Sequence, residues 1–263
     1  MASLNQNNNE TCGLAIQQGV ATLTLQRPEV LNAFNRTQRV EMVQALREVA
    51  QDDSVRVLVI TGQGKAFCAG QDQNESAAMD AAASADRIDE FMALYREIRG
   101  LRKPIIARLN GVAAGSGLQI ALLADLRIAA ESARIGMTEL NVGSTPITGS
   151  ALLWEIAGQA ATKRLILLSE IVSAGEALAL NIVHEVVPDA ALDTRIAEIT
   201  ARIKRWEPTT VALTKAWWES MDDDLFERMA ATARSAHAEN FASGAYSAGA
   251  KRFKTRSAGG TSD

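Results

Sequence analysis

Hydrophobic and polar residues alternate from Leu14 to Leu25, and Gly19 interrupts the alternation near its centre. Successive side chains of a β-strand point to opposite faces, so this pattern predicts two strands joined by a tight turn. We expect the hairpin to end at Arg27 and Pro28. The ordered part of the chain is therefore predicted to begin with a β-hairpin.

After this hairpin the apolar positions recur every three to four residues, which is typical of an amphipathic helix. Asn35 is a suitable capping residue, and we expect the helix to run to about Ala50. Two largely apolar segments, at 55–60 and 104–109, are typical of buried strands instead. Further strands are predicted at 126–129, 134–137 and 182–187, and further helices at 87–100, from about 115, and over most of the chain after 150.

Strands that alternate with helical crossovers predict an α/β fold built from parallel ββα-type units. Ser173 and Glu176 have the spacing of a capping box for a helix at 174–180. The last third of the chain is helical and lacks partner strands, so we expect it to form either an appendage or an oligomerisation layer. The predicted division is a disordered tail over 1–10, a core over 11–200, a helical oligomerisation region over 201–256 and a flexible tail over 257–263.

The composition is that of a globular protein, with 47% hydrophobic and 22% charged residues among 263. A net charge of −4 argues against nucleic acid as a partner, because binding phosphates requires a basic surface. No apolar run approaches the length of a membrane span, so we expect no membrane partner either. Two cysteines, Cys12 and Cys68, fit a reducing compartment. A secretory leader begins with basic residues, whereas no lysine or arginine precedes Arg27 here. We therefore expect a cytoplasmic protein.

Three segments have residue types that are suited to chemistry, and each also has an ordinary structural interpretation. Residues 67–72 place small residues after a strand, which suits either close approach to a ligand or a surface turn. Residues 110–119 place glycines at a helix start, which suits either anion binding or tight packing. Residues 136–143 contain Glu139 among apolar and small neighbours, either as a proton-transfer group or as an exposed loop residue.

Metal chemistry has little support in the sequence. His184 and His237 are the only histidines, and neither has the spacing of a metal-binding motif. The acidic run at 222–224 is typical of a helix N-terminus rather than a metal site. We expect no metal and no separate cofactor.

Taken together and in order, these segments resemble the crotonase, or enoyl-CoA hydratase/isomerase, superfamily over roughly residues 14–256. The matching pieces are at 27–33, 59–62, 66–72, 103–104, 110–115, 125–133, 175–177, 186–188 and 251–252. The resemblance implies a spiral of ββα units with a C-terminal helical trimerisation region, assembled as a homo-trimer or homo-hexamer. It also implies an acyl-CoA thioester as substrate, so that coenzyme A is part of the substrate rather than a cofactor.

The resemblance implies that two backbone N–H groups hold the thioester oxygen as it becomes an enolate. The matching positions are Gln71 and Ser116, and Ser116 falls at a helix N-terminus where negative charge is favoured. The hydratase pattern has two catalytic glutamates. Glu139 keeps the second, whereas Gln119 stands at the first. A glutamine side chain cannot remove a proton at neutral pH.

Two kinds of function follow from this departure. The first is an enzyme in which Glu139 acts as acid and base, either hydrating a double bond or moving it by 3,2-isomerisation. The second is a catalytically weak acyl-CoA-binding member of the fold, since Gln119 replaces the first glutamate. The resemblance further implies contacts to the substrate or to coenzyme A from Arg27, Ala66, Ala69, Asp72, Gly115, Lys251 and Phe253. Residues 72–86 are expected to form a mobile lid over the acyl chain.

Overall fold

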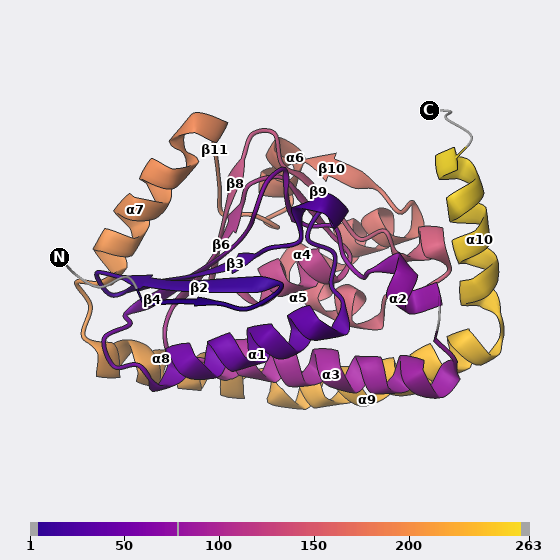
Figure 1. The fold of residues 1–263 in the computed structure, drawn as a ribbon, viewed down its shortest axis with the longest axis horizontal. Coiled ribbons are helices and arrows are strands. Elements are labelled where there is room, and N and C mark those ends of the chain that lie inside the picture. The colour runs from indigo at the N-terminus through magenta and orange to yellow at the C-terminus, as the bar shows by residue number, and fades with distance from the viewer. Residues whose placement is uncertain (1–4, 78, 259–263) are drawn as a thin grey trace.

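Two β-sheets organise the chain in the computed structural model, which describes residues 5–77 and 79–258 (Figure 1). Within these residues the larger sheet has seven strands in the order β1-β2-β3-β4-β6-β8-β11. They are β1 Asn5–Asn8, β2 Cys12–Gln17, β3 Val20–Leu25, β4 Val57–Gly62, β6 Ile105–Leu109, β8 Leu126–Ala130 and β11 Glu185–Val187. β1, β2 and β3 pair antiparallel, and the rest of the sheet is parallel.

The smaller sheet has the order β10-β9-β7-β5. Its strands are β5 Ala66–Cys68, β7 Val112–Ala114, β9 Arg134–Gly136 and β10 Ile171–Ser173. β4, β6 and β8 of the larger sheet are each followed by a strand of the smaller sheet and then by helix. This repeated order confirms the predicted α/β spiral of ββα units.

Helices surround the two sheets. They are α1 Arg36–Gln51, α2 Gln73–Ala77, α3 Ala81–Gly100, α4 Ser116–Leu123, α5 Ile147–Leu167, α6 Ala174–Ala179, α7 Leu192–Ile203, α8 Pro208–Ser220, α9 Asp223–Ala242 and α10 Ala245–Ala258. Short 3-10 turns are η1 Pro28–Val30, η2 Glu139–Val142 and η3 Asp189–Ala191. α1, α3 and α9 lie side by side along one side of the molecule, and α10 stands at its far end (Figure 1).

The helix caps predicted from the sequence are confirmed. The Asn35 side chain accepts a hydrogen bond from the Gln38 N–H at the start of α1, at 2.9 Å. Ser173 and Glu176 form the reciprocal capping box of α6. These side chains satisfy backbone donors that have no partner inside the helix, and so they set where each helix begins.

β4 is buried at every position because helices cover both faces of the sheet at this strand. Leu58 and Ile60 point into the larger core, beneath α1 and α3. Val57 and Val59 point to the other face, where they share a second cluster with residues of α7. Burial on both faces explains why this strand is a continuous apolar run in the sequence.

The expectation of a disordered tail over residues 1–10 is wrong for residues 5–8. Asn5–Asn8 form β1, in which Asn5 lies opposite Ile16 and Asn8 opposite Gly13. An edge strand is held by backbone hydrogen bonds, which do not depend on apolar side chains, so the polar composition concealed it. Residues 1–4 lie outside the described residues.

The C-terminal tail also differs from expectation at its start, because α10 extends through residues 257 and 258. Residues 259–263 of that predicted tail lie outside the described residues. Upstream, the polar stretch at 72–86 contains α2 and the first turns of α3. Asp80 accepts a hydrogen bond from the Ala83 N–H at 2.8 Å, which caps α3 six residues before the predicted start.

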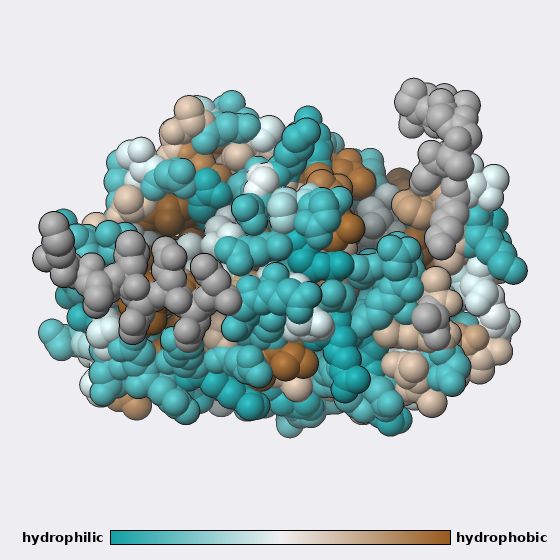
Figure 2. All heavy atoms as spheres, viewed as in Figure 1, coloured by the Kyte–Doolittle hydropathy of each residue, from teal (hydrophilic) through white to brown (hydrophobic). Residues whose placement is uncertain are grey.

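The part of the molecule that the structure describes contains no helix long and apolar enough to cross a membrane. The same residues hold no group of three or more histidine, cysteine, aspartate and glutamate side chains that is suited to a metal ion. The face drawn in Figure 2, formed largely by β2, α1 and α3, is mainly hydrophilic, with hydrophobic residues in small separate groups.

Candidate functional site

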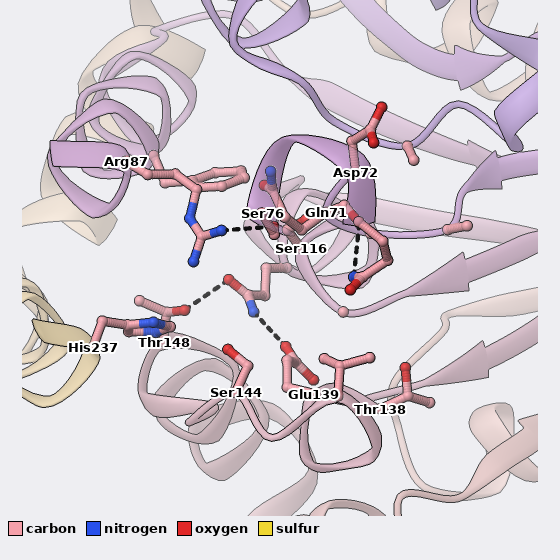
Figure 3. A pocket seen from close by; sticks show the side chains of 18 of the residues that line it. Gln71, Asp72, Ser76, Arg87, Ser116, Thr138, Glu139, Ser144, Thr148 and His237 are labelled. Carbon is pink, nitrogen blue, oxygen red and sulfur yellow. Dashed lines mark hydrogen bonds between the residues drawn. The ribbon is translucent and has the colours of Figure 1, made fainter. Parts of the chain in front are cut away.

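The residues that the sequence singles out for oxyanion binding and proton transfer line one cavity of about 380 Å³. Gln71 comes from the loop after β5, Ser116 and Gln119 from the first turn of α4, and Glu139 from η2. Their backbone segments converge because β5, β7 and β9 are neighbours in the smaller sheet. Figure 3 shows Glu139 directed into this cavity.

Two glycines let the loop after β5 approach the start of α4. Gly70 has a φ of 104° and Gly115 a φ of 52°, both in the region that side chains disfavour. A Cβ on Gly70 would lie 3.0 Å from the Ala114 carbonyl oxygen and 3.7 Å from the Gly115 Cα. The small residues of both segments are therefore required by the close contact between them, and the residues that follow them are brought to one place.

The backbone N–H groups after these glycines are available as donors. Phe34 and Gln71 form a parallel bridge in which the Phe34 N–H donates to Gly70 and the Asp72 N–H donates to Phe34. In this pattern the N–H of Gln71 itself has no acceptor among the described residues. Ser116 is the first residue of α4, where N–H groups have no partner within the helix and the helix dipole favours negative charge. Both donors suit an oxyanion.

The side-chain amide of Gln119 joins four elements. Its Oε1 accepts hydrogen bonds from the Tyr95 hydroxyl of α3 and the Thr148 hydroxyl of α5, both at 2.7 Å. Its Nε2 donates two hydrogen bonds, one to Glu139 Oε1 at 2.9 Å and one to Met137 Sδ at 3.9 Å. All of the donor and acceptor capacity of this amide is thereby used.

Glu139 keeps one oxygen without a partner. Its Oε1 is held by Gln119, whereas its buried Oε2 has no hydrogen bond among the described residues. Burial raises the pKa of Glu139 to about 7, against smaller lowering effects of its own backbone N–H and of the Gln119 amide. A carboxyl group with this pKa exists in both protonation states near neutral pH, as a group that takes up and returns a proton requires.

The residues expected to contact coenzyme A fall into two sets. Ala69, Asp72, Gly115 and Phe253 line the cavity with the catalytic candidates. Arg27, Ala66 and Lys251 do not.

Each residue of the second set has a clear position. Arg27 forms an ion pair with Asp72 at 2.8 Å. Burial raises the pKa of Asp72, but the hydrogen bond and charge of Arg27 and nearby backbone N–H groups lower it further, so the net pKa is below its ordinary value. Ala66 is fully buried, and its carbonyl accepts hydrogen bonds from Asn32 and Asn110. Lys251 is exposed on α10.

Sequence reasoning missed Tyr95 and Thr148, which hold Gln119, and Arg87, which also lines the cavity. A signal was present for α3, because Arg87, Phe91 and Tyr95 are spaced four residues apart and share one helix face. His237, which lacks the spacing of a metal-binding motif in the sequence, also lines the cavity. Burial and the neighbouring charge of Arg87 lower the pKa of His237 to about 4, so its imidazole is neutral at pH 7.

Known proteins resemble this chain in both sequence and structure. The family model described as Enoyl-CoA hydratase/isomerase matches residues 15–258. A 1,2-epoxyphenylacetyl-CoA isomerase of Escherichia coli K12 is 40% identical over 202 residues, which are 74% of this chain and 76% of the relative. A 2,3-dehydroadipyl-CoA hydratase of the same strain is 34% identical over 200 residues, or 76% and 78% of the two chains. The crystal structure of an enoyl-CoA hydratase from Mycobacterium avium subsp. paratuberculosis K-10 superposes with a TM-score of 0.86 at 26% identity, covering 95% of this chain and 97% of that one.

The raised pKa of Glu139 predicts a specific dependence of stability on pH. Between its ordinary value of 4.5 and about 7, the folded state binds more protons at this site than the unfolded state. Below pH 4.5 this group therefore makes its full contribution to the free energy of unfolding. As the pH rises through 7, that contribution decreases by about 3 kcal/mol. We expect Glu139→Gln to remove this loss, so that the variant gains stability relative to the parent between pH 5 and pH 8. Denaturant unfolding of both proteins at the two pH values measures it, and parallel stability curves would contradict a buried, unpaired Glu139.

Proposed function

The chain belongs to the enoyl-CoA hydratase/isomerase family, and on that premise we propose that it is an enzyme that moves a carbon–carbon double bond in an acyl-CoA thioester. The substrate is a 3-enoyl-CoA and the product a 2-enoyl-CoA, or the reverse. Coenzyme A is part of the substrate, and the reaction needs no further cofactor. One observation carries the proposal: the site offers one carboxyl group with one free oxygen, beside two free backbone donors.

The proposed reaction begins when the thioester oxygen accepts hydrogen bonds from the N–H groups of Gln71 and Ser116. Glu139 Oε2 then removes a proton from the carbon next to the thioester, and the electron pair moves into an enolate that the two donors stabilise. The protonated Glu139 returns the proton to the γ carbon, and the double bond shifts by one position. No atom is added or lost, so one acid–base group is sufficient.

Hydration is the competing activity, because several relatives at 34–35% identity have names that describe hydratases. Water addition requires one group to activate water and a group to return a proton to the α carbon. Gln119 has no donor or acceptor left with which to hold that water, since Tyr95, Thr148, Glu139 and Met137 use all of them. This saturation supports migration over hydration. The name of the relative at 40% identity describes an isomerisation of a coenzyme A thioester, which likewise adds no water.

A catalytically weak acyl-CoA-binding role is the other alternative, and it too starts from Gln119 at the first glutamate position. In that role Glu139 would only need to be buried. The unpartnered Oε2 and the pKa near 7 are expensive features for a residue without chemistry, because burying a polar group without a hydrogen bond costs free energy. They support the enzyme.

The proposal extends to the rest of the bound substrate. Arg27, Ala69 and Asp72 line the channel for the pantetheine and adenine, and the fully buried Ala66 shapes this channel from behind. Lys251 and Phe253 contact the nucleotide end, and Gly115 contacts the substrate from the cavity wall. The position of Phe253 and Lys251 on one helix, α10, supports a shared role for the C-terminal segment.

We also propose that the chain assembles as a homo-trimer or homo-hexamer through its C-terminal helices. Leu213, Trp217 and Met221 are spaced four residues apart on and just after α8, and all three are more than 60% exposed. A large exposed apolar face of this kind is typical of a protein–protein contact. Phe226 and Met229 are instead buried within the chain, where Arg99 lies over the Phe226 ring, so they do not belong to this face.

Glu139→Gln is expected to lower turnover of a 3-enoyl-CoA by about 10²-fold or more, which is the usual contribution of a positioned acid–base group. Affinity for the thioester should change little, because the donors to its oxygen are backbone groups. Glu131→Gln, an exposed substitution outside the cavity, is the matched control. Assays with 2-enoyl- and 3-enoyl-CoA, followed by separation of 3-hydroxyacyl and enoyl products, measure both reactions. A parent enzyme that only hydrates, or a variant with near-parental migration, would overturn the proposal.

Gln119→Glu is expected to raise hydration relative to migration. The new carboxyl group stands where an amide now lies 2.9 Å from Glu139, so the two groups will share one proton. Tyr95 and Thr148 continue to donate to the new group and favour its ionised form, which leaves one base and one acid in the site. The ratio of 3-hydroxyacyl-CoA to isomerised enoyl-CoA measures the effect, with Gln119→Met as the control that removes the amide without adding a carboxyl group. An unchanged ratio in a folded variant would show that residue 119 does not control the fate of water.

Light scattering at micromolar concentration should give the mass of three or six chains. Trp217→Glu is expected to dissociate the assembly, because a charge cannot be buried in an apolar contact without a partner. Val40→Glu, on the exposed face of α1, should leave the assembly intact and serves as the control. A monomeric parent protein would refute the proposed assembly.

A further inference from the structure

Arg87 is a charged residue of the cavity that the proposed reaction does not use. It lies on α3, is 4% exposed, and lines the same cavity as Glu139. Figure 3 shows its guanidinium directed into the cavity, on the side of Ser76 and His237 and away from Glu139. The cation therefore faces a part of the cavity distinct from the one where the thioester is proposed to react.

The guanidinium has little compensation from the protein. One of its nitrogens donates to Ser76 Oγ at 2.8 Å, and its Cζ atom lies over the Phe241 ring, 5.4 Å from the ring centre. Arg87 makes no ion pair among the described residues. The carboxylates of Glu75 on α2 and Glu90 on α3 are both paired with Arg39, at 3.0 and 2.8 Å, and Glu90 is also paired with Arg36 at 2.9 Å.

Other groups around Arg87 do not supply an anion. Tyr246 donates to Gln73 at 3.1 Å, and the buried Nδ1 of His237 has no hydrogen bond. The acidic residues that line the cavity are Asp72 and Glu139. Arg27 neutralises Asp72, and Gln119 holds Glu139. This part of the cavity therefore carries an unbalanced positive charge.

A buried cation without a counter-ion is strongly unfavourable, and arginine is suited to binding carboxylates with two parallel hydrogen bonds. We propose that the acyl group of the substrate carries a carboxylate at its far end, and that Arg87, assisted by Ser76, binds it. The substrate class is then the coenzyme A monothioester of an unsaturated dicarboxylic acid. This inference rests on the proposed function, because it assumes that an acyl-CoA occupies the cavity.

The two ends of the cavity have complementary roles in this proposal. The backbone donors hold the thioester oxygen near Glu139, and Arg87 holds the distal carboxylate. A substrate bound at both ends is fixed along its length, which keeps its α and γ carbons within reach of one carboxyl group. A neutral acyl chain of the same length leaves the cation of Arg87 uncompensated and is therefore disfavoured.

Binding of saturated ligands tests the inference separately from the reaction, since saturated thioesters have no double bond to move. Calorimetric titration compares hexanoyl-CoA with adipyl-CoA, and likewise the four- and eight-carbon pairs, which differ only in a terminal methyl or carboxylate. The parent protein should bind the carboxylate member at least tenfold more tightly at the length that fits. Arg87→Met should abolish this preference while hexanoyl-CoA affinity stays within about threefold. Equal affinity of the parent for both members at every length, or a preference retained in Arg87→Met, overturns the inference.

Arg96→Met is the matched control, because Arg96 lies on the same helix but is paired with Glu227 at the surface. It should leave both affinities unchanged.

Arg87→Met should be as stable to heat as the parent or more so, because it removes an unpaired buried charge, whereas a structural role for Arg87 predicts a loss of stability. Should Arg87→Met fail to fold, Arg87→Lys keeps the charge but not the paired donors. It must then show a preference for adipyl-CoA reduced at least threefold, and an unreduced preference overturns the inference.

Failure of the two proposals is distinguishable. Loss of the carboxylate preference with double-bond migration intact overturns the role of Arg87 alone. A carboxylate preference in binding without any turnover of enoyl-CoA overturns the proposed reaction and leaves the binding role of Arg87 standing.

Discussion

The orientation of one amide group determines the chemistry of the site. The side-chain oxygen of Gln119 accepts hydrogen bonds from hydroxyl groups of two helices, and its nitrogen is therefore oriented to donate to Glu139. The contact joins α3, α4, α5 and η2, which belong to different turns of the spiral. Because hydrogen bonds of this kind strengthen one another in a dry interior, the position of Glu139 depends on residues up to 44 positions away in the chain, as far as Tyr95.

Two buried charged groups of the cavity are informative because the protein satisfies its other buried charges, by ion pairs or, for Arg127, by hydrogen bonds to four backbone carbonyls. Arg39 is almost fully buried, yet Glu75 and Glu90 neutralise it, and Arg27 and Asp72 neutralise each other. The carboxyl group of Glu139 and the guanidinium of Arg87 are buried in the same cavity without an ion-pair partner among the described residues. A protein that satisfies its other buried charges with its own groups gains nothing in stability from these two. The free-energy cost of burying them is explained if a bound ligand supplies the missing interaction partner of each group.

Local pattern was sufficient for much of the fold. The hairpin around Gly19, the helix capped by Asn35 and the capping box at Ser173 follow from short-range chemistry, and all are found in the structure. β5 and β7 have three residues each, too few to show a period of two, and they were not predicted, whereas β9 and β11 lie within predicted strands. β1 was missed because its polar residues are held by the backbone alone.

For the site, local residue types singled out Glu139 and the two glycine-containing loops, and the resemblance to the crotonase superfamily implied Gln119. It did not indicate Thr148 or Arg87, because their role depends on α5 and α3 meeting α4 around a cavity. No pattern within a single helix reports which buried polar group will find a partner in another element. Residues whose role depends on tertiary contacts are therefore found in the structure and not in the sequence.

The number of hydrogen-bond donors in the site explains why a glutamine suits position 119. An ionised carboxylate there would accept from Tyr95 and Thr148 as the amide does, but it would have no hydrogen to offer Glu139 and would repel it. The amide satisfies all three neighbours without adding a titratable group. It thereby leaves Glu139 as the one group at the oxyanion donors that titrates near neutral pH. Replacing a carboxyl group by its amide removes the second acid–base group while keeping the hydrogen bonds that position the first, and this favours reactions that return the same proton to the substrate over reactions that require water.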